Sequence, residues 1–219
     1  MQQLVLRGVE LLHGEALGVD LAAHRVETSA GSLTYDFLVV ALGAELAPDS
    51  IPGLAESAQT FYTFDGASKL RIVLRDFSRG KIAIVVAGPP FKCPTAPYEG
   101  AMLIADLFKR CGLRDKVDLH LFTPEPLPMP VAGPELGNAV RRMVEDREIA
   151  FHPFQKLTEA NPVTRTISFE GKESFTYDLL IAVPATRDCP KSGAFPDGAG
   201  RAGRREAVDR DSSKPGFQV

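Results

Sequence analysis

The stretch Lys81-Ile82-Ala83-Ile84-Val85-Val86-Ala87 decides the fold class of this chain. A continuous apolar run of this kind is typical of a strand buried on both faces, as strands are in a parallel sheet. A turn over residues 88–94 follows, and then a helix over residues 97–111 that starts with proline, whose missing N–H has no helical partner at that position. Strand, turn and helix in this order indicate an α/β fold.

The segments on either side continue the alternation of strand and helix. Apolar residues recur at helical spacing over residues 65–79 and 135–148, and a further strand is expected at Val117–Phe122. Short apolar runs separated by turn residues predict antiparallel meanders over residues 9–28 and 149–176. The chain should therefore hold a parallel sheet with helices and two meanders.

Each meander leads into the same pattern. Tyr35-Asp36-Phe37-Leu38-Val39-Val40-Ala41 follows the first, and Tyr177-Asp178-Leu179-Leu180-Ile181-Ala182-Val183 follows the second. We therefore expect both stretches to be buried strands of two Rossmann-like domains, the first of them incomplete. The expected borders are 1–66 for the first domain, 67–186 for the second and 187–219 for a loosely ordered tail, which is rich in glycine and almost lacks large aliphatic residues.

Composition excludes several classes of protein. The chain has 219 residues and a net charge of -3, which argues against a nucleic-acid partner. It contains no apolar run long enough to span a bilayer and no signal-peptide pattern, so a cytoplasmic protein is expected. Three cysteines without close spacing argue against a disulfide scaffold, and four histidines in separate elements argue against a metal site.

Cys93 is the strongest candidate for chemistry. It follows Lys92 and precedes a helix start, and both positive charge and the helix dipole favour thiolate over thiol. Glu99 lies in the first turn of the same helix, where a carboxylate can either complement the dipole or transfer a proton. Cys111, at the far end of that helix, is expected to be a packing residue, because free cysteine is among the most buried residue types.

Three stretches carry a resemblance to a known family. Residues 91–101, Phe-Lys-Cys-Pro-Thr-Ala-Pro-Tyr-Glu-Gly-Ala, resemble the cysteine-containing turn of the sulfide:quinone oxidoreductase and flavocytochrome c sulfide dehydrogenase branch of the FAD-dependent pyridine nucleotide-disulfide oxidoreductases. Residues 35–44 are similar to a flavin-domain segment of that branch, and residues 177–184 to the strand that closes its second domain. The likeness covers about residues 8–186 and implies an internal or truncated portion, because the sequence does not open with the GxGxxG turn with which the family begins.

The resemblance implies a cofactor, partners and site residues. The cofactor would be FAD, and the residues implied to bind it are Ala41, Leu42, Gly43, Ala44 and Pro90. A small sulfur-containing substrate would react at Cys93, with Lys92 and Glu99 as further catalytic residues, and electrons would pass to a quinone or a cytochrome. Cys189 is a candidate partner of Cys93, although its sequence context differs from that of the family's second redox cysteine. Attachment to the inner face of a membrane and formation of a homo-oligomer stay open.

Two alternatives remain. The first is an NAD(P)H-dependent flavin disulfide reductase or dehydrogenase. It is disfavoured because Pro89 and Pro90 offer no N–H groups in the turn that would hold a dinucleotide phosphate. The second is a non-catalytic, truncated Rossmann-fold module that binds a partner.

Overall fold

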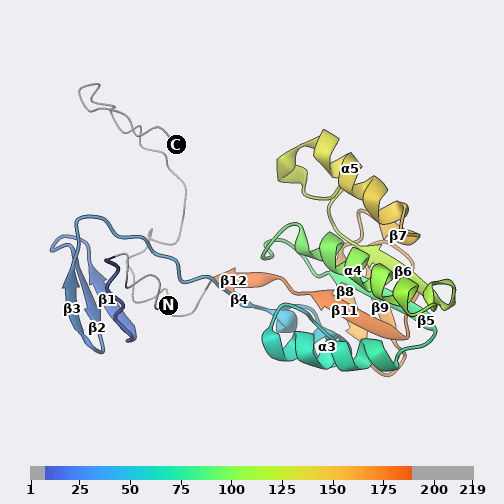
Figure 1. Cartoon of the computed structure of the whole chain (residues 1–219), viewed down its shortest axis with the longest axis horizontal. Helices are drawn as coiled ribbons and strands as arrows, with labels where there is room; N and C mark the ends of the chain where they lie inside the picture. The colour runs from blue at the N-terminus through green and yellow to red at the C-terminus, as the bar shows by residue number, and fades with distance from the viewer. Residues whose placement is uncertain (1–7, 189–219) are drawn as a thin grey trace. The chain divides into compact units, whose positions relative to one another are not determined.

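A computed structural model describes residues 8–188 of the chain (Figure 1). Residues 8–43 and Asp188 belong to one compact unit, and Ala44–Arg187 form a second. The expected domain borders at residues 66 and 186 stay predictions, because a division by compactness does not test a division by function. Of the tail expected over residues 187–219, residues 189–219 lie outside the described residues.

The first unit is an antiparallel meander, which the sequence predicts over residues 9–28 and which the structure forms from residue 16 to residue 34. Its strands pair in the order β1-β2-β3, and they are β1 (Ala16–Asp20), β2 (Arg25–Thr28) and β3 (Gly31–Thr34). Asp20 makes the turn between β1 and β2, because its carboxylate accepts hydrogen bonds from the N–H groups of Ala22 and Ala23.

The second unit is built on a four-stranded parallel sheet. Its strands lie in the order β11-β5-β6-β7, and they are β5 (Gly80–Val86), β6 (Val117–Phe122), β7 (Ile149–His152) and β11 (Leu179–Val183). The helices of this unit are α2 (Leu54–Ser57), α3 (Phe64–Asp76), α4 (Ala96–Arg110) and α5 (Pro134–Glu145), with 3-10 turns η1 (Pro48–Ser50), η2 (Arg114–Lys116) and η3 (Pro130–Ala132). This strand order is that of half a Rossmann fold, so the expected α/β class is confirmed.

The second meander is shorter than predicted. It comprises β8 (Leu157–Asn161), β9 (Thr166–Phe169) and β10 (Phe175–Thr176), paired in the order β10-β9-β8. Residues 149–152 were expected to belong to it but form the parallel strand β7 instead. The reason is that α5 carries the chain back across the sheet, and a strand after such a crossover lies parallel to the strand before it.

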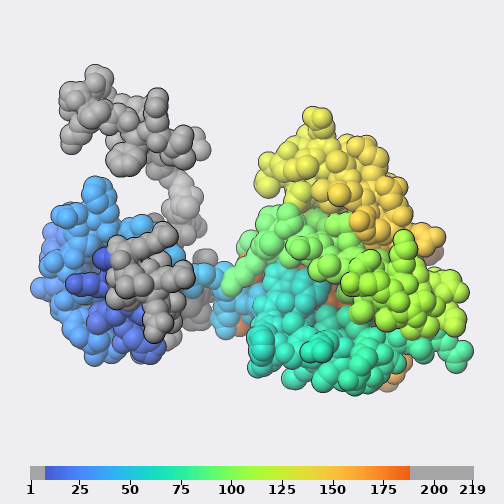
Figure 2. Space-filling model, in the orientation of Figure 1, coloured from blue at the N-terminus to red at the C-terminus, as the bar shows by residue number. Residues whose placement is uncertain are grey.

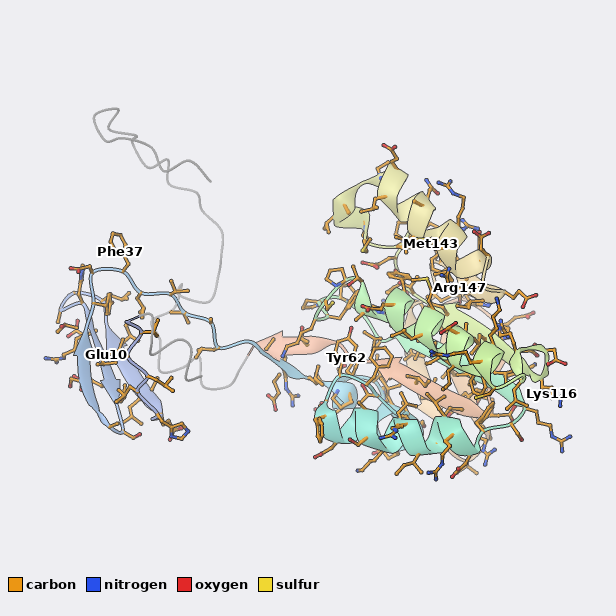
Figure 3. The ribbon with its side chains drawn as sticks, viewed as in Figure 1. Glu10, Phe37, Tyr62, Lys116, Met143 and Arg147 are labelled. Atoms are coloured by element: carbon orange, nitrogen blue, oxygen red, sulfur yellow. The ribbon has the colours of Figure 1, made fainter. Side chains whose placement is uncertain are left out.

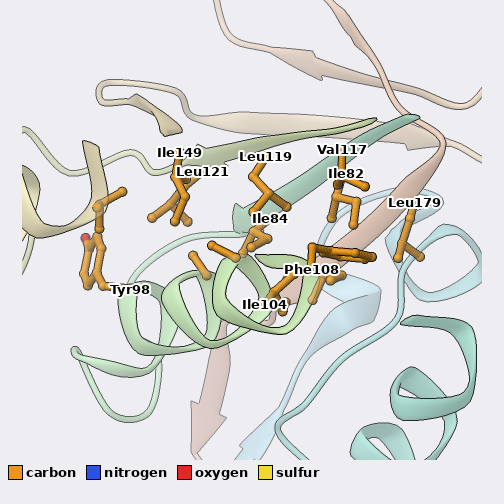
Figure 4. Packing of buried hydrophobic residues seen from close by; sticks show 14 of the residues in the cluster. Ile82, Ile84, Tyr98, Ile104, Phe108, Val117, Leu119, Leu121, Ile149 and Leu179 are labelled. Carbon is orange, nitrogen blue, oxygen red and sulfur yellow. The ribbon is translucent and has the colours of Figure 1, made fainter. Parts of the chain in front are cut away.

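The sheet is buried on both faces. Ile82 and Ile84 of β5 pack with Phe108 of α4 in a core on the helical side (Figure 4). The residues that alternate with them, Ala83 and Val85, pack in a second core under the antiparallel strands β8 and β9. Figure 2 shows α3, α4 and α5 in teal, green and yellow on the helical side. Full burial of an aliphatic side chain contributes roughly 1.5–3 kcal/mol, so these alternating residues hold the layers together.

The stretch over residues 35–43 corrects the sequence prediction. It was expected to be a buried strand, but in the structure it forms no strand from residue 35 to residue 43. Phe37 is 94% exposed and projects away from the meander (Figure 3). Val39 is 87% exposed. A strand needs hydrogen-bonding neighbours, and none of the described strands pairs with this stretch.

A short antiparallel ribbon lies at the start and end of the second unit. It pairs β4 (Ala44–Leu46) with β12 (Thr186–Asp188). Arg187 forms ion pairs across it with Glu45 at 3.2 Å and with Asp49 at 2.9 Å. The ribbon thereby brings residues 184–186, which follow β11, next to the turn that follows β5.

Candidate functional site

The candidate site lies where β5 and β11 end, at the carboxyl edge of the parallel sheet. Here the strand order changes direction, and this is where open α/β sheets bind ligands. The turn after β5 contains Gly88, Pro89 and Pro90, and the carbonyl oxygen of Pro90 accepts two hydrogen bonds from Thr186. The backbone N–H of Thr186 donates at 2.7 Å and its hydroxyl donates at 3.0 Å. The two turns that would flank a ligand are therefore joined directly.

Cys93 is exposed in the turn before α4. Its backbone φ is 53°, in the left-handed region that non-glycine residues seldom adopt. Its Sγ lies 3.2 Å from the hydroxyl oxygen of Thr95, and its carbonyl oxygen accepts the N–H of Ala96 at 3.0 Å, where α4 begins. The helix start that the sequence predicts beside this cysteine is confirmed.

Tyr62 contacts the cysteine turn from a segment far earlier in the chain. Its hydroxyl donates a hydrogen bond of 2.8 Å to the carbonyl oxygen of Lys92, the residue before Cys93. Burial, and secondarily the negative charge of the Cys93 thiolate, raises the pKa of Tyr62 to about 12. Sequence reasoning missed this residue because no local spacing connects the loop before α3 to the turn before α4.

The structure brings some of the implied site residues together and leaves others apart. Lys92 and Cys93 share one exposed turn with Pro90, and Glu99 is exposed in the first turn of α4. Ala41, Leu42 and Gly43 are exposed in the first unit, whereas Ala44 opens β4 in the second. Their roles stay predictions.

The other two cysteines have different outcomes. Cys111 was expected to be a packing residue, but it is exposed at the C-cap of α4, so that expectation was wrong. The helix ends at Arg110, one residue before Cys111, so position at a helix end decided its exposure more than residue type did. Cys189 lies outside the described residues.

Two polar pairs in the second unit were not found from the sequence. Buried Tyr98 donates a hydrogen bond of 3.3 Å to Glu125, and burial raises the pKa of that carboxyl group. His120 of β6 and His152 of β7 stack with Nδ1 and Nε2 3.1 Å apart. Burial lowers the pKa of both, and the neighbouring His152 adds to the effect on His120. Register between strands produced this pair, and no sequence spacing encodes it.

The described residues offer only part of a flavin site. No described helix begins with a GxGxxG turn, which would supply N–H groups and a dipole to a pyrophosphate. Residues 41–43 do not form a cradle, since they lie exposed outside any strand. Among residues 8–188, no group of three or more metal-binding side chains is found, and no helix is both long enough and apolar enough to cross a bilayer.

A parallel sheet with the Rossmann strand order and a turn at its carboxyl edge is typical of the class of dinucleotide-binding proteins. The family model described as pyridine nucleotide-disulphide oxidoreductase matches residues 2–184. The chain belongs to this family of flavoprotein oxidoreductases, whose cofactor is FAD.

Relatives come from two branches of the family. The chain is 27% identical over 161 residues to the mitochondrial sulfide:quinone oxidoreductase of Dictyostelium discoideum, covering 69% of this chain and 35% of the relative. It is 29% identical over 176 residues to the type II NADH:quinone oxidoreductase of Staphylococcus haemolyticus, covering 75% and 44%. The solved sulfide:quinone oxidoreductase of Aquifex aeolicus shares the fold with a TM-score of 0.67 at 23% identity, over 87% of this chain and 46% of that one. The chain thus spans less than half the length of these relatives.

Proposed function

We propose that this chain is the cysteine-bearing portion of a sulfide:quinone oxidoreductase-like, FAD-dependent enzyme that oxidises a small sulfur-containing substrate at Cys93. One observation carries the proposal: Cys93 is exposed in a turn directly before a fifteen-residue helix and next to Lys92. The relatives that are sulfide:quinone oxidoreductases support the choice of substrate and of a quinone as electron acceptor, with a cytochrome as the other candidate. Their quinone partner also supports peripheral attachment to a membrane.

The chain's own residues would act on the cysteine sulfur. The thiolate, which is the nucleophilic form of cysteine, would lie in the turn between Lys92 and the amino-terminal end of α4. Glu99, one helical turn into α4, would hold a proton close to the sulfur. FAD would accept electrons in the complete protein, and the described residues of this chain supply no step for it.

A second candidate function is that of an NADH-dependent quinone reductase. The type II NADH:quinone oxidoreductase from Staphylococcus haemolyticus favours it. Against it, Pro89 and Pro90 lack N–H groups, and Thr186 engages the carbonyl oxygen of Pro90 where a dinucleotide would enter. Titration calorimetry with NADH separates the two, since low-micromolar binding, about -8 kcal/mol, would favour the second candidate.

Competitive alkylation tests the proposed role of Cys93. Cys93 and Cys111 are both exposed, so a difference in their rates does not come from burial. They lie at opposite ends of α4, so the helix dipole acts on them with opposite sign. We expect a neutral alkylating reagent at pH 7 to label Cys93 faster than Cys111 by about tenfold, as read by mass spectrometry of the two peptides.

The variant Lys92→Ala tests the role of the charge. It should lower the alkylation rate of Cys93 and leave the alkylation rate of Cys111 unchanged. Equal rates at the two cysteines, or faster labelling of Cys111 or Cys189, would contradict a reactive Cys93. That result would favour the non-catalytic binding module instead.

A further inference from the structure

We propose that Tyr62 is a positioning residue for Cys93, acting through its hydrogen bond to the peptide group that precedes the cysteine. The inference rests on the proposed function, because it assumes that the thiol of Cys93 is the reacting group. It goes beyond that function by assigning the geometry of the thiol to a residue of another segment. Tyr62 lies in the loop before α3 (Figure 3).

The conformation of Cys93 requires support. A φ of 53° places its Cβ against the backbone, and residues other than glycine hold such a conformation only where their surroundings enforce it. Cys93 is exposed, so packing around its side chain does not supply this support. Hydrogen bonds to the turn must supply it.

Three contacts fix the turn around the sulfur. The hydroxyl of Tyr62 donates to the carbonyl oxygen of Lys92 at 2.8 Å and so fixes the peptide plane before Cys93. The N–H of Ala96 holds the carbonyl of Cys93 at 3.0 Å, and the Thr95 hydroxyl meets Sγ at 3.2 Å. Ala96 and Thr95 belong to the same turn, whereas Tyr62 ties that turn to the rest of the unit.

The environment of Tyr62 suits this task. Its pKa of about 12, raised by burial first and then by the charge of Cys93, keeps the hydroxyl protonated across the working range of pH. A protonated phenol is a permanent donor, and the Lys92 carbonyl is its acceptor. The hydrogen bond therefore persists when the thiol ionises, and it keeps the peptide group before Cys93 in place.

Tyr62→Phe removes this donor and keeps the ring. We expect alkylation of Cys93 at pH 7 to slow about fivefold, the factor that corresponds to the net contribution of one hydrogen bond. The alkylation rate of Cys111 in the same sample should not change. The pH profile of Cys93 alkylation is recorded for both proteins, and an identical profile would leave Tyr62 a merely structural role.

Two further variants complete the experiment. Tyr98→Phe removes another hydroxyl of the same unit, one that contacts Glu125, and should leave the pH profile of Cys93 unchanged. Tyr62→His keeps a ring N–H donor and should retain more of the original rate than Tyr62→Phe; equal rates in these two variants would count against the hydrogen bond. If Cys93 is alkylated faster than Cys111 but Tyr62→Phe has the rates of the parent protein, the inference about Tyr62 fails and the proposed function stands. If Cys93 never outpaces Cys111, the proposed function itself fails.

Discussion

Residues 35–43 and residues 177–185 carry one sequence pattern and reach different structures. Each begins with Tyr-Asp, continues with five apolar residues and follows an antiparallel meander. The second copy becomes β11, an edge strand of the parallel sheet whose five residues are all buried, while the first remains an exposed segment with no strand. The difference shows that an apolar run specifies a buried strand only when the chain also supplies its neighbours.

The neighbours of the second copy can be named. β11 pairs with β5 along one edge, and on the other edge Gln59 exchanges hydrogen bonds with Leu180 and Ala182 at 2.9 and 2.8 Å. Asp178 accepts the N–H of Lys81 at 2.8 Å, next to Gly80, where a Cβ would lie 2.3 Å from the Asp178 carboxylate. The sequence of β5 is thus fitted to the Tyr-Asp motif of β11.

The first copy makes only local contacts. Tyr35 stacks on His24 with the rings 5.4 Å apart and nearly parallel, and its N–H donates to the carbonyl of His24. Asp36 is exposed, and the apolar side chains after it face solvent. Exposed apolar residues in a row favour self-association. A strand from another polypeptide that paired with this segment would remove its apolar side chains from water.

The largest effect is expected from truncating equivalent residues of the two copies. Ile181→Ala should lower the free energy of unfolding by about 2–5 kcal/mol, because Ile181 is fully buried and its loss leaves a cavity. Val39→Ala, at the matching position, should change it by no more than about 0.5 kcal/mol, because Val39 is 87% exposed. Urea unfolding followed by circular dichroism measures both. Similar losses in the two variants would mean that the first copy is buried in solution.

A smaller effect is expected at the two aspartates of the motif. Asp178→Ala should cost about 1 kcal/mol, because it removes a charge-assisted hydrogen bond to the start of β5 at an exposed position. Asp36→Ala should be neutral, since Asp36 makes no such bond to a described strand. The urea unfolding midpoints of the two variants test the hydrogen bond between Asp178 and Lys81. Gly80→Ala is a third variant, which crowds the same carboxylate. A loss in Asp36→Ala equal to that in Asp178→Ala would place both motifs against a strand.

The smallest effect is expected from pH, and it concerns His120 and His152 of the parallel sheet, which stack on each other beside Phe175 of β10. Burial lowers the pKa of His120 and His152, whose neighbours include Asp118 and Lys81, so the folded chain binds fewer protons than the unfolded chain. The contribution of the two neutral histidines to the free energy of unfolding is complete above the ordinary histidine pKa of about 6.5. It is lost as the pH falls below that value.

Unfolding midpoints measured between pH 7 and pH 5 should therefore decline, and His152→Gln should flatten the decline. His24→Gln in the first unit serves as the control and should leave the slope as it is. A slope that His152→Gln does not alter would show that other groups set the pH dependence.

The sequence by itself determined the elements whose signals are local. Val117–Phe122 forms a strand with the predicted bounds, α3 and α4 begin within a residue of their predicted starts, and Cys93 stands before a helix as expected. Periodicity, proline placement and apolar run length decide such features over one or two turns of chain. The turn with Lys92 and Cys93 was therefore predictable, although the catalytic roles of its residues remain predictions.

Only the tertiary structure decided what depends on distant segments. Neighbouring strands and helices set the exposure of residues 35–43, the parallel placement of β7 and the His120–His152 pair. They also set the hydrogen bond from Tyr62 to the cysteine turn. A strand's hydrogen bonds and a side chain's burial are supplied by partners far away in the sequence. The same Tyr-Asp pattern therefore ends buried where β5 lies beside it and exposed where no described strand does.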